Sequence, residues 1–201
     1  MTLERQKILE QKLKSDLTPT SIGILISLYT GLRIGEICAL RWADIDLDMR
    51  TIYVRHTVSR VKSAKNSCKT ELILDEPKTA SSKRIVPIPS PLLSVLVACR
   101  CESVDSYVVS GNDSFVSPRT YDARFHKIVE ACQLESFNYH GLRHTFATRC
   151  IEAGVDVYLL EKQFCEYFWN EYFLEKNNNY VSLIRFFLTF FLNCNIIRLY
   201  H

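Results

Sequence analysis

The pattern of apolar and polar positions along the chain predicts a series of helices at its start. Residues 2–14 place four apolar side chains on an otherwise polar helix, with Thr2 as its N-cap. The next stretch, TPTSIGILISLYTG, is far more apolar and is typical of a buried helix that ends at Gly31, a C-cap residue. Another helix is expected in LRIGEICALRW, which would place Arg33 in its first turn.

Three later stretches alternate between apolar and polar residues in the manner of β-strands. They are TIYVRHTVSRV, KTELILDEP and SKRIVPIP, and we expect them to form a three-stranded antiparallel meander. Further helices are expected at about 91–100, 118–132 and 139–153. No linker rich in Pro, Gly or Ser interrupts this order, so the sequence predicts one α+β domain that is mostly α-helical.

Composition changes this picture at the end of the chain. No glycine follows Gly154, whereas seven of the 11 Phe and six of the nine Asn lie at position 164 or beyond. These are residue types that A/T-rich codons encode. We therefore interpret 1–157 as a truncated domain and 158–201 as an aberrant tail, produced by a frameshift, an insertion or read-through. A genuine apolar C-terminal helix would have a similar composition.

Charge and cysteine content narrow the class of protein further. A chain of 201 residues is long enough for one domain with a substantial core. Its net charge of +3 is too small to indicate a polyanionic partner by itself. Eight Cys without a signal peptide favour reduced thiols in a cytoplasmic protein. Because the chain has no C-x-x-C pair, we do not expect a zinc site.

The apolar tail also raises the question of a membrane anchor. The segment YVSLIRFFLTFFLNCNII has about the length of a spanning helix. However, Arg185, Asn193 and Asn195 interrupt it, and each is unfavourable in the bilayer core. We therefore expect no membrane anchoring.

A group of basic residues lies in NYHGLRHTFATRC, where His140, Arg143 and His144 occupy adjacent helical turns. An H-x-x-R pair can grip an anion, but it also arises by chance in a helix whose arginine faces water. A metal held by His140 and His144 would lack a third ligand and would lie beside the fixed charge of Arg143. A metal site is therefore not expected here.

Basic residues elsewhere change the significance of this pair. Arg33 lies at a predicted helix N-terminus, where anions are favoured, although it can also simply pair with Glu36. Lys78 lies at the tip between two expected strands, in EPKTASSKRIVPIP, where a solvated turn residue is the alternative. The same strands carry a basic rim that suits DNA phosphates, formed by Lys62, Lys65, Lys69, Lys83 and Arg84.

In their order and spacing, LYTGLRIGEICALRWADID, EPKTASSKRIVPIP and HGLRHTFATR closely resemble the catalytic domain of tyrosine recombinases of the phage and transposon integrase type. The resemblance runs from about residue 3 to 157. It implies that Arg33 and Arg143 clamp the scissile phosphate, that Lys78 is the general acid for the departing 5′-oxygen, and that His140 assists proton transfer. Glu36 would match an acidic position that buttresses the first arginine.

The implied activity is site-specific cleavage and rejoining of double-stranded DNA through a 3′-phosphotyrosyl intermediate. Two guanidinium groups can neutralise the charge that develops on the phosphate, so the resemblance implies neither a metal nor another cofactor. The expected partners are DNA and, on DNA, further copies of the chain or a full-length integrase. A small-molecule substrate is not expected.

Two departures from the family pattern predict an inactive chain. Extending the register beyond Val157 puts the third basic position on Glu166 and the nucleophile on Lys176. Tyr180, in NNNYV, is a weak candidate for the nucleophile, because the residues around it resemble the family's tyrosine segment slightly. In addition, the family's usual upstream core-binding domain would have to precede Met1. We expect weak, mainly non-specific DNA binding. The alternatives are a non-catalytic module that occupies recombination sites or dampens a full-length integrase, and a nicking enzyme like a type IB topoisomerase.

Overall fold

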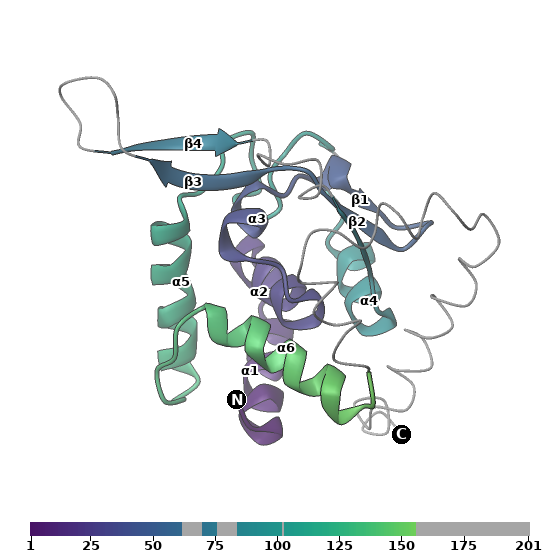
Figure 1. Cartoon of the computed structure of the whole chain (residues 1–201), viewed down its shortest axis with the longest axis vertical. Coiled ribbons are helices and arrows are strands. Elements are labelled where there is room, and N and C mark those ends of the chain that lie inside the picture. Colours follow the sequence, from purple (N-terminus) through teal and green to yellow (C-terminus); the bar gives the residue numbers. More distant parts are fainter. Residues whose placement is uncertain (62–69, 76–83, 102, 156–201) are drawn as a thin grey trace.

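A computed structural model describes residues 1–61, 70–75, 84–101 and 103–155 of the chain. Along these residues, a first group of helices is followed by the strands of two small antiparallel sheets and then by a second group of helices (Figure 1). In chain order the elements are α1 (Leu3–Ser15), α2 (Pro19–Thr30), α3 (Ile34–Ala39), the short 3-10 helix η1 (Trp42–Asp44), β1 (Ile45–Asp46), β2 (Thr51–Val54), β3 (Thr57–Val61), β4 (Glu71–Asp75), β5 (Arg84–Pro87), α4 (Ser90–Ala98), α5 (Pro118–Ala131) and α6 (His140–Glu152).

Helix α2 is the centre of the hydrophobic core. Each residue from Ser21 to Thr30 is buried, because α1, α3, α4, α5 and α6 all contact this helix (Figure 1). Local signals set its ends: the Thr18 side chain accepts a hydrogen bond from the Ser21 N–H, and Gly31 closes the helix with a φ of 70°. The sequence predicted both the apolar helix and its glycine cap, and both predictions are confirmed.

The strands differ from the expected meander, although the mostly helical α+β class is confirmed. The stretch expected to be one long strand breaks at Arg55 and His56 into β2 and β3. Strand β2 lies between β1 and β5, while β3 pairs separately with β4. The first stretch therefore pairs with both later ones, and the prediction that the three follow one another in a meander was wrong.

Helix α3 packs directly against β3, so closely that a Cβ atom on Gly35 would lie 2.6 Å from Thr57 Oγ1 and 2.8 Å from the Val58 carbonyl oxygen. Val58 is buried beneath this contact. Glycine is thus required here by close approach rather than by backbone conformation. The packing also holds the start of α3, which carries Arg33.

One boundary matters for the site. Helix α3 begins at Ile34, so Arg33 is its N-cap residue and does not lie in the first helical turn as the sequence suggested. The Glu36 side chain accepts a hydrogen bond from the Arg33 N–H at 2.8 Å, which satisfies an N–H at the helix start.

Among the described residues, no helix is long and apolar enough to cross a membrane, and the apolar segment of the tail lies outside them.

Candidate functional site

Arg33 presents its guanidinium group partly to solvent, directly after the turn that ends α2. Its Nη1 donates to Glu36 Oε1 at 3.2 Å, and 43% of the side chain is exposed. The contact with Glu36 orients the guanidinium group without burying it. Arg33 can therefore offer its remaining donors and its charge to an anion in solvent.

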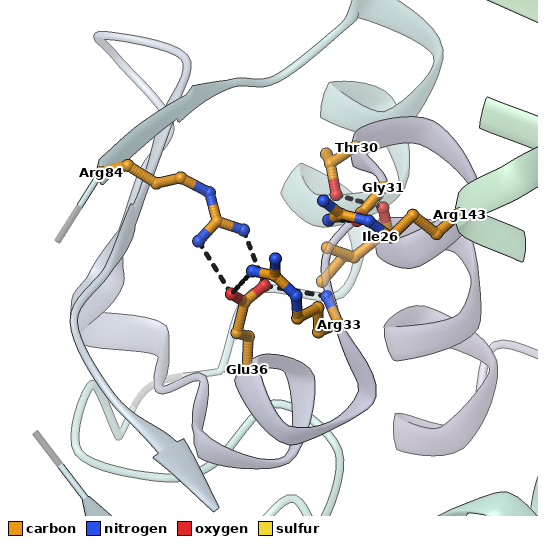
Figure 2. A network of polar contacts seen from close by, with 7 residues as sticks. All are labelled: Ile26, Thr30, Gly31, Arg33, Glu36, Arg84 and Arg143. Atoms are coloured by element: carbon orange, nitrogen blue, oxygen red, sulfur yellow. Dashed lines mark hydrogen bonds and ion pairs between the residues drawn. The ribbon is translucent and has the colours of Figure 1, made fainter. Parts of the chain in front are cut away.

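Arg143 reaches the same turn from α6. Its Nη1 donates a 2.6 Å hydrogen bond to the carbonyl oxygen of Gly31, and the residue is buried. Gly31 caps the C-terminal end of α2, where the helix dipole favours a cation. Because Gly31 precedes Arg33 by only two residues, this bond brings the second guanidinium group to the turn that carries the first (Figure 2).

His140 begins α6, less than one turn before Arg143, and its side chain is exposed. Its ring lies 4.6 Å from the ring of His144, edge to face. Partial burial lowers the pKa of His140, and so does the positive charge of His144, Arg143 and Arg33. The influence of both arginines on one imidazole is a second sign that these three side chains share one region. His140 is mainly neutral at pH 7.

Glu36 connects Arg33 to a second arginine, on β5. Arg84 Nη1 donates to Glu36 Oε1 at 2.8 Å, and Arg84 Nη2 donates to Oε2 at 2.7 Å. Burial acts to raise the pKa of the Glu36 carboxyl, but hydrogen bonds and charge from Arg84, then from Arg33, hold this pKa below its ordinary value. Glu36 is therefore a buried, ionised carboxylate shared by two guanidinium groups (Figure 2).

The structure places Arg84 differently from the sequence expectation. Arg84 was expected on an exposed basic rim, but its side chain is only 6% exposed and pairs with Glu36. The alternation in β5 contained the signal for this orientation, since Arg84 and Val86 share the buried face of the strand. The identity of its partner, 48 residues away in sequence, could not be read from the same pattern.

Several predicted site residues lie outside the described part of the chain, and their roles stay predictions. They are Lys78 as general acid, Tyr180 as nucleophile candidate, and the rim lysines Lys62, Lys65, Lys69 and Lys83. Within the described ranges, no three His, Cys, Asp or Glu side chains gather as a metal site would require. What the described residues bring together is Arg33, Arg143 and His140, a set that suits a phosphate group.

Comparison with known proteins agrees with the resemblance found in the sequence motifs. The model of the phage integrase family matches residues 4–164. A XerC-like tyrosine recombinase of Caldanaerobacter subterraneus subsp. tengcongensis is 32% identical over 149 residues, which cover 65% of this chain and 38% of that protein. A tyrosine recombinase of Pseudothermotoga lettingae is 26% identical over 162 residues, covering 79% of this chain and 48% of the relative. The chain thus spans less than half the length of either protein.

Solved structures show the same fold at lower sequence identity. The integrase of transposon Tn1549, in complex with circular intermediate DNA, has a TM-score of 0.62 and 24% identity, covering 81% of this chain and 57% of the other. The XerA recombinase has a TM-score of 0.61 and 21% identity, covering 92% of this chain and 63% of the other. These matches support the arrangement of helices and sheets described above.

Proposed function

Because this chain belongs to the phage integrase family, we propose that it binds double-stranded DNA and grips one backbone phosphate with Arg33, Arg143 and His140. The observation that carries the proposal is the hydrogen bond from Arg143 to Gly31, which brings two guanidinium groups to one turn. A related transposon integrase has been solved in complex with DNA, and this supports DNA as the ligand.

The three side chains suit the phosphoryl transfer that the resemblance to tyrosine recombinases implies. When a tyrosine oxygen attacks the phosphorus, the bond to the 5′-oxygen breaks and a 3′-phosphotyrosyl bond forms. Negative charge then increases on the non-bridging oxygens, where the permanently charged Arg33 and Arg143 would stabilise it. His140 and Lys78 would supply and accept protons at the bridging oxygens. The reverse attack by a 5′-hydroxyl rejoins the strand and releases the tyrosine.

We further propose that this chain binds DNA without completing strand cleavage. In the register that extends from the H-x-x-R helix, the nucleophile position carries Lys176 and the third basic position carries Glu166. An amine cannot replace the phenol in a phosphotyrosyl link, and a carboxylate repels the phosphate. The chain would therefore occupy DNA sites as a binding module of the recombinase type.

Equilibrium binding to a labelled duplex over a range of salt concentrations tests the proposal. Arg33→Ala and Arg143→Ala should each weaken binding and reduce the slope of log affinity against log salt by about 1. Arg119→Ala is a matched control: it removes one exposed arginine on α5, beside the opposite end of α2, where Tyr121 donates to the Thr20 carbonyl. Equal losses in all three variants would contradict the proposal.

A further inference from the structure

Arg84 is a buried cation whose charge and donors are directed at one carboxylate. Its two Nη atoms bind the two oxygens of Glu36 at 2.8 and 2.7 Å, and both side chains are almost completely buried. Placed on β5 with only 6% of its side chain exposed, Arg84 is poorly placed to touch DNA directly. Any effect of Arg84 on phosphate binding must therefore pass through Glu36.

The carboxylate of Glu36 has two opposing effects on Arg33. It orients the arginine, because it accepts hydrogen bonds from the backbone N–H at 2.8 Å and from Nη1 at 3.2 Å. It also competes with any phosphate for the same guanidinium group, because a carboxylate binds arginine in the same bidentate manner. Its negative charge would in addition repel a phosphate that approaches Arg33.

The geometry shows which arginine holds the carboxylate more tightly. Arg84 forms two short bonds that occupy both carboxylate oxygens, whereas the Arg33 guanidinium forms one longer bond at its edge. Arg84 thus largely neutralises the charge of Glu36 from the buried side. On the solvent side, Glu36 orients Arg33 but does not enclose its guanidinium group. Figure 2 shows Arg84 and Arg143 entering from opposite sides, with Glu36 and Arg33 between them.

We propose that Arg84 is a positioning residue for Arg33: by pairing with Glu36 in a bidentate manner, it lets Glu36 orient Arg33 while leaving the charge of Arg33 for a DNA phosphate. The inference rests on the proposed function, because it requires that Arg33 binds phosphate. Without Arg84, the Glu36 carboxylate would pair fully with the Arg33 guanidinium group and compete with the DNA phosphate for it.

The test compares DNA affinity and its salt dependence in variants of the full chain. Arg84→Gln should weaken binding to a generic labelled duplex roughly 10- to 100-fold, as Arg33→Ala does, because the uncompensated Glu36 carboxylate would then withhold Arg33 from the phosphate. It should also lower the salt slope by about 1, although residue 84 is buried. Adding Glu36→Gln to Arg84→Gln should recover most of the lost affinity, because no carboxylate then competes for Arg33.

Val86→Ala is the matched control for a merely structural effect. It removes apolar volume from the same buried face of β5 without changing charge. It should lower the melting temperature and leave the salt slope unchanged. If Arg84→Gln alone does not fold, the double variant and Arg84→Lys decide. The double variant should bind nearly as well as the parent chain, and Arg84→Lys should bind more weakly, because lysine cannot occupy both carboxylate oxygens.

The possible outcomes separate this inference from the proposed function. If Arg33→Ala leaves DNA affinity unchanged, the proposed function fails and the inference fails with it. If Arg33→Ala weakens binding but folded Arg84→Gln does not, only the inference is overturned. It is likewise overturned if the Arg84→Gln, Glu36→Gln double variant binds as weakly as Arg33→Ala. It is also overturned if a variant that combines Arg33→Ala with Arg84→Gln loses the sum of the two single binding free energies.

Discussion

Arg143 on α6 donates a 2.6 Å hydrogen bond to the carbonyl of Gly31, the residue that caps α2. Gly31 can accept this bond in its present orientation because it adopts a φ of 70°, which glycine reaches without steric penalty. The same residue therefore ends the central helix and holds the second arginine of the site.

Replacing Gly31 tests this double role. Gly31→Ala should lower the free energy of unfolding by about 1 kcal/mol, because a Cβ atom disfavours the left-handed conformation. Gly31→Asn should be milder, since Asn tolerates that conformation better than Ala. Urea denaturation of both variants measures the difference. Equal stability of the Ala variant and the parent chain would contradict the need for glycine at this cap.

The contact between α3 and β3 leads to a second stability prediction. In Gly35→Ala the new Cβ atom would meet Thr57 Oγ1 at 2.6 Å and the Val58 carbonyl oxygen at 2.8 Å. Overpacking of this kind costs about 1–3 kcal/mol. Thermal unfolding should therefore shift to lower temperature. Adding Thr57→Ala should restore only part of the lost stability, because the contact with Val58 is with its backbone. Complete recovery in the double variant would contradict a role for the Val58 contact.

His140 should make DNA binding depend on pH. Burial and the neighbouring charges of His144, Arg143 and Arg33 lower the pKa of His140 below its ordinary value of 6.5 in the free protein. A bound phosphate favours the protonated ring, so DNA binding should take up a proton and strengthen as the pH falls. Binding isotherms of the parent chain and of His140→Gln measure this effect. The variant should show a flatter pH profile.

The stability of the folded chain should change with pH in the opposite direction from DNA binding. Because the folded-state pKa of His140 is lowered, the unfolded chain binds the proton more readily, and stability falls as the pH drops through the ordinary value of 6.5. His140→Gln should therefore lose less stability on acidification than the parent chain. Equal pH profiles of the two proteins, for both binding and unfolding, would show that His140 does not titrate in this range.

Local signals predicted much of the fold, and long-range contacts decided the rest. The caps at Thr18 and Gly31 depend on neighbouring residues, so the ends of α2 could be predicted from the sequence. The division of the strand region into two sheets accompanies the packing of α3 against β3, a contact between distant segments that the alternation pattern does not contain. Likewise, burial of Arg84 was readable from β5, whereas its pairing with Glu36 was not.

The proposed loss of strand cleavage can be tested with a nicked suicide substrate that traps covalent protein–DNA intermediates. We expect no adduct with this chain, because Lys176 occupies the register position of the nucleophile. Separation on a denaturing gel detects the adduct. An adduct that persists in the parent chain and disappears in Tyr180→Phe would identify Tyr180 as the nucleophile and overturn the proposed inactivity.

The phosphate grip is tested most directly by NMR of the arginine Nε–H groups during titration of the full chain with a short DNA duplex. Arg33 and Arg143 should shift together along one saturable isotherm, since they bind one phosphate from the two sides of the Gly31 turn. The signal of Arg119 on α5 should stay in place. Shifts at Arg119 with unchanged signals from Arg33 and Arg143 would contradict the proposed site.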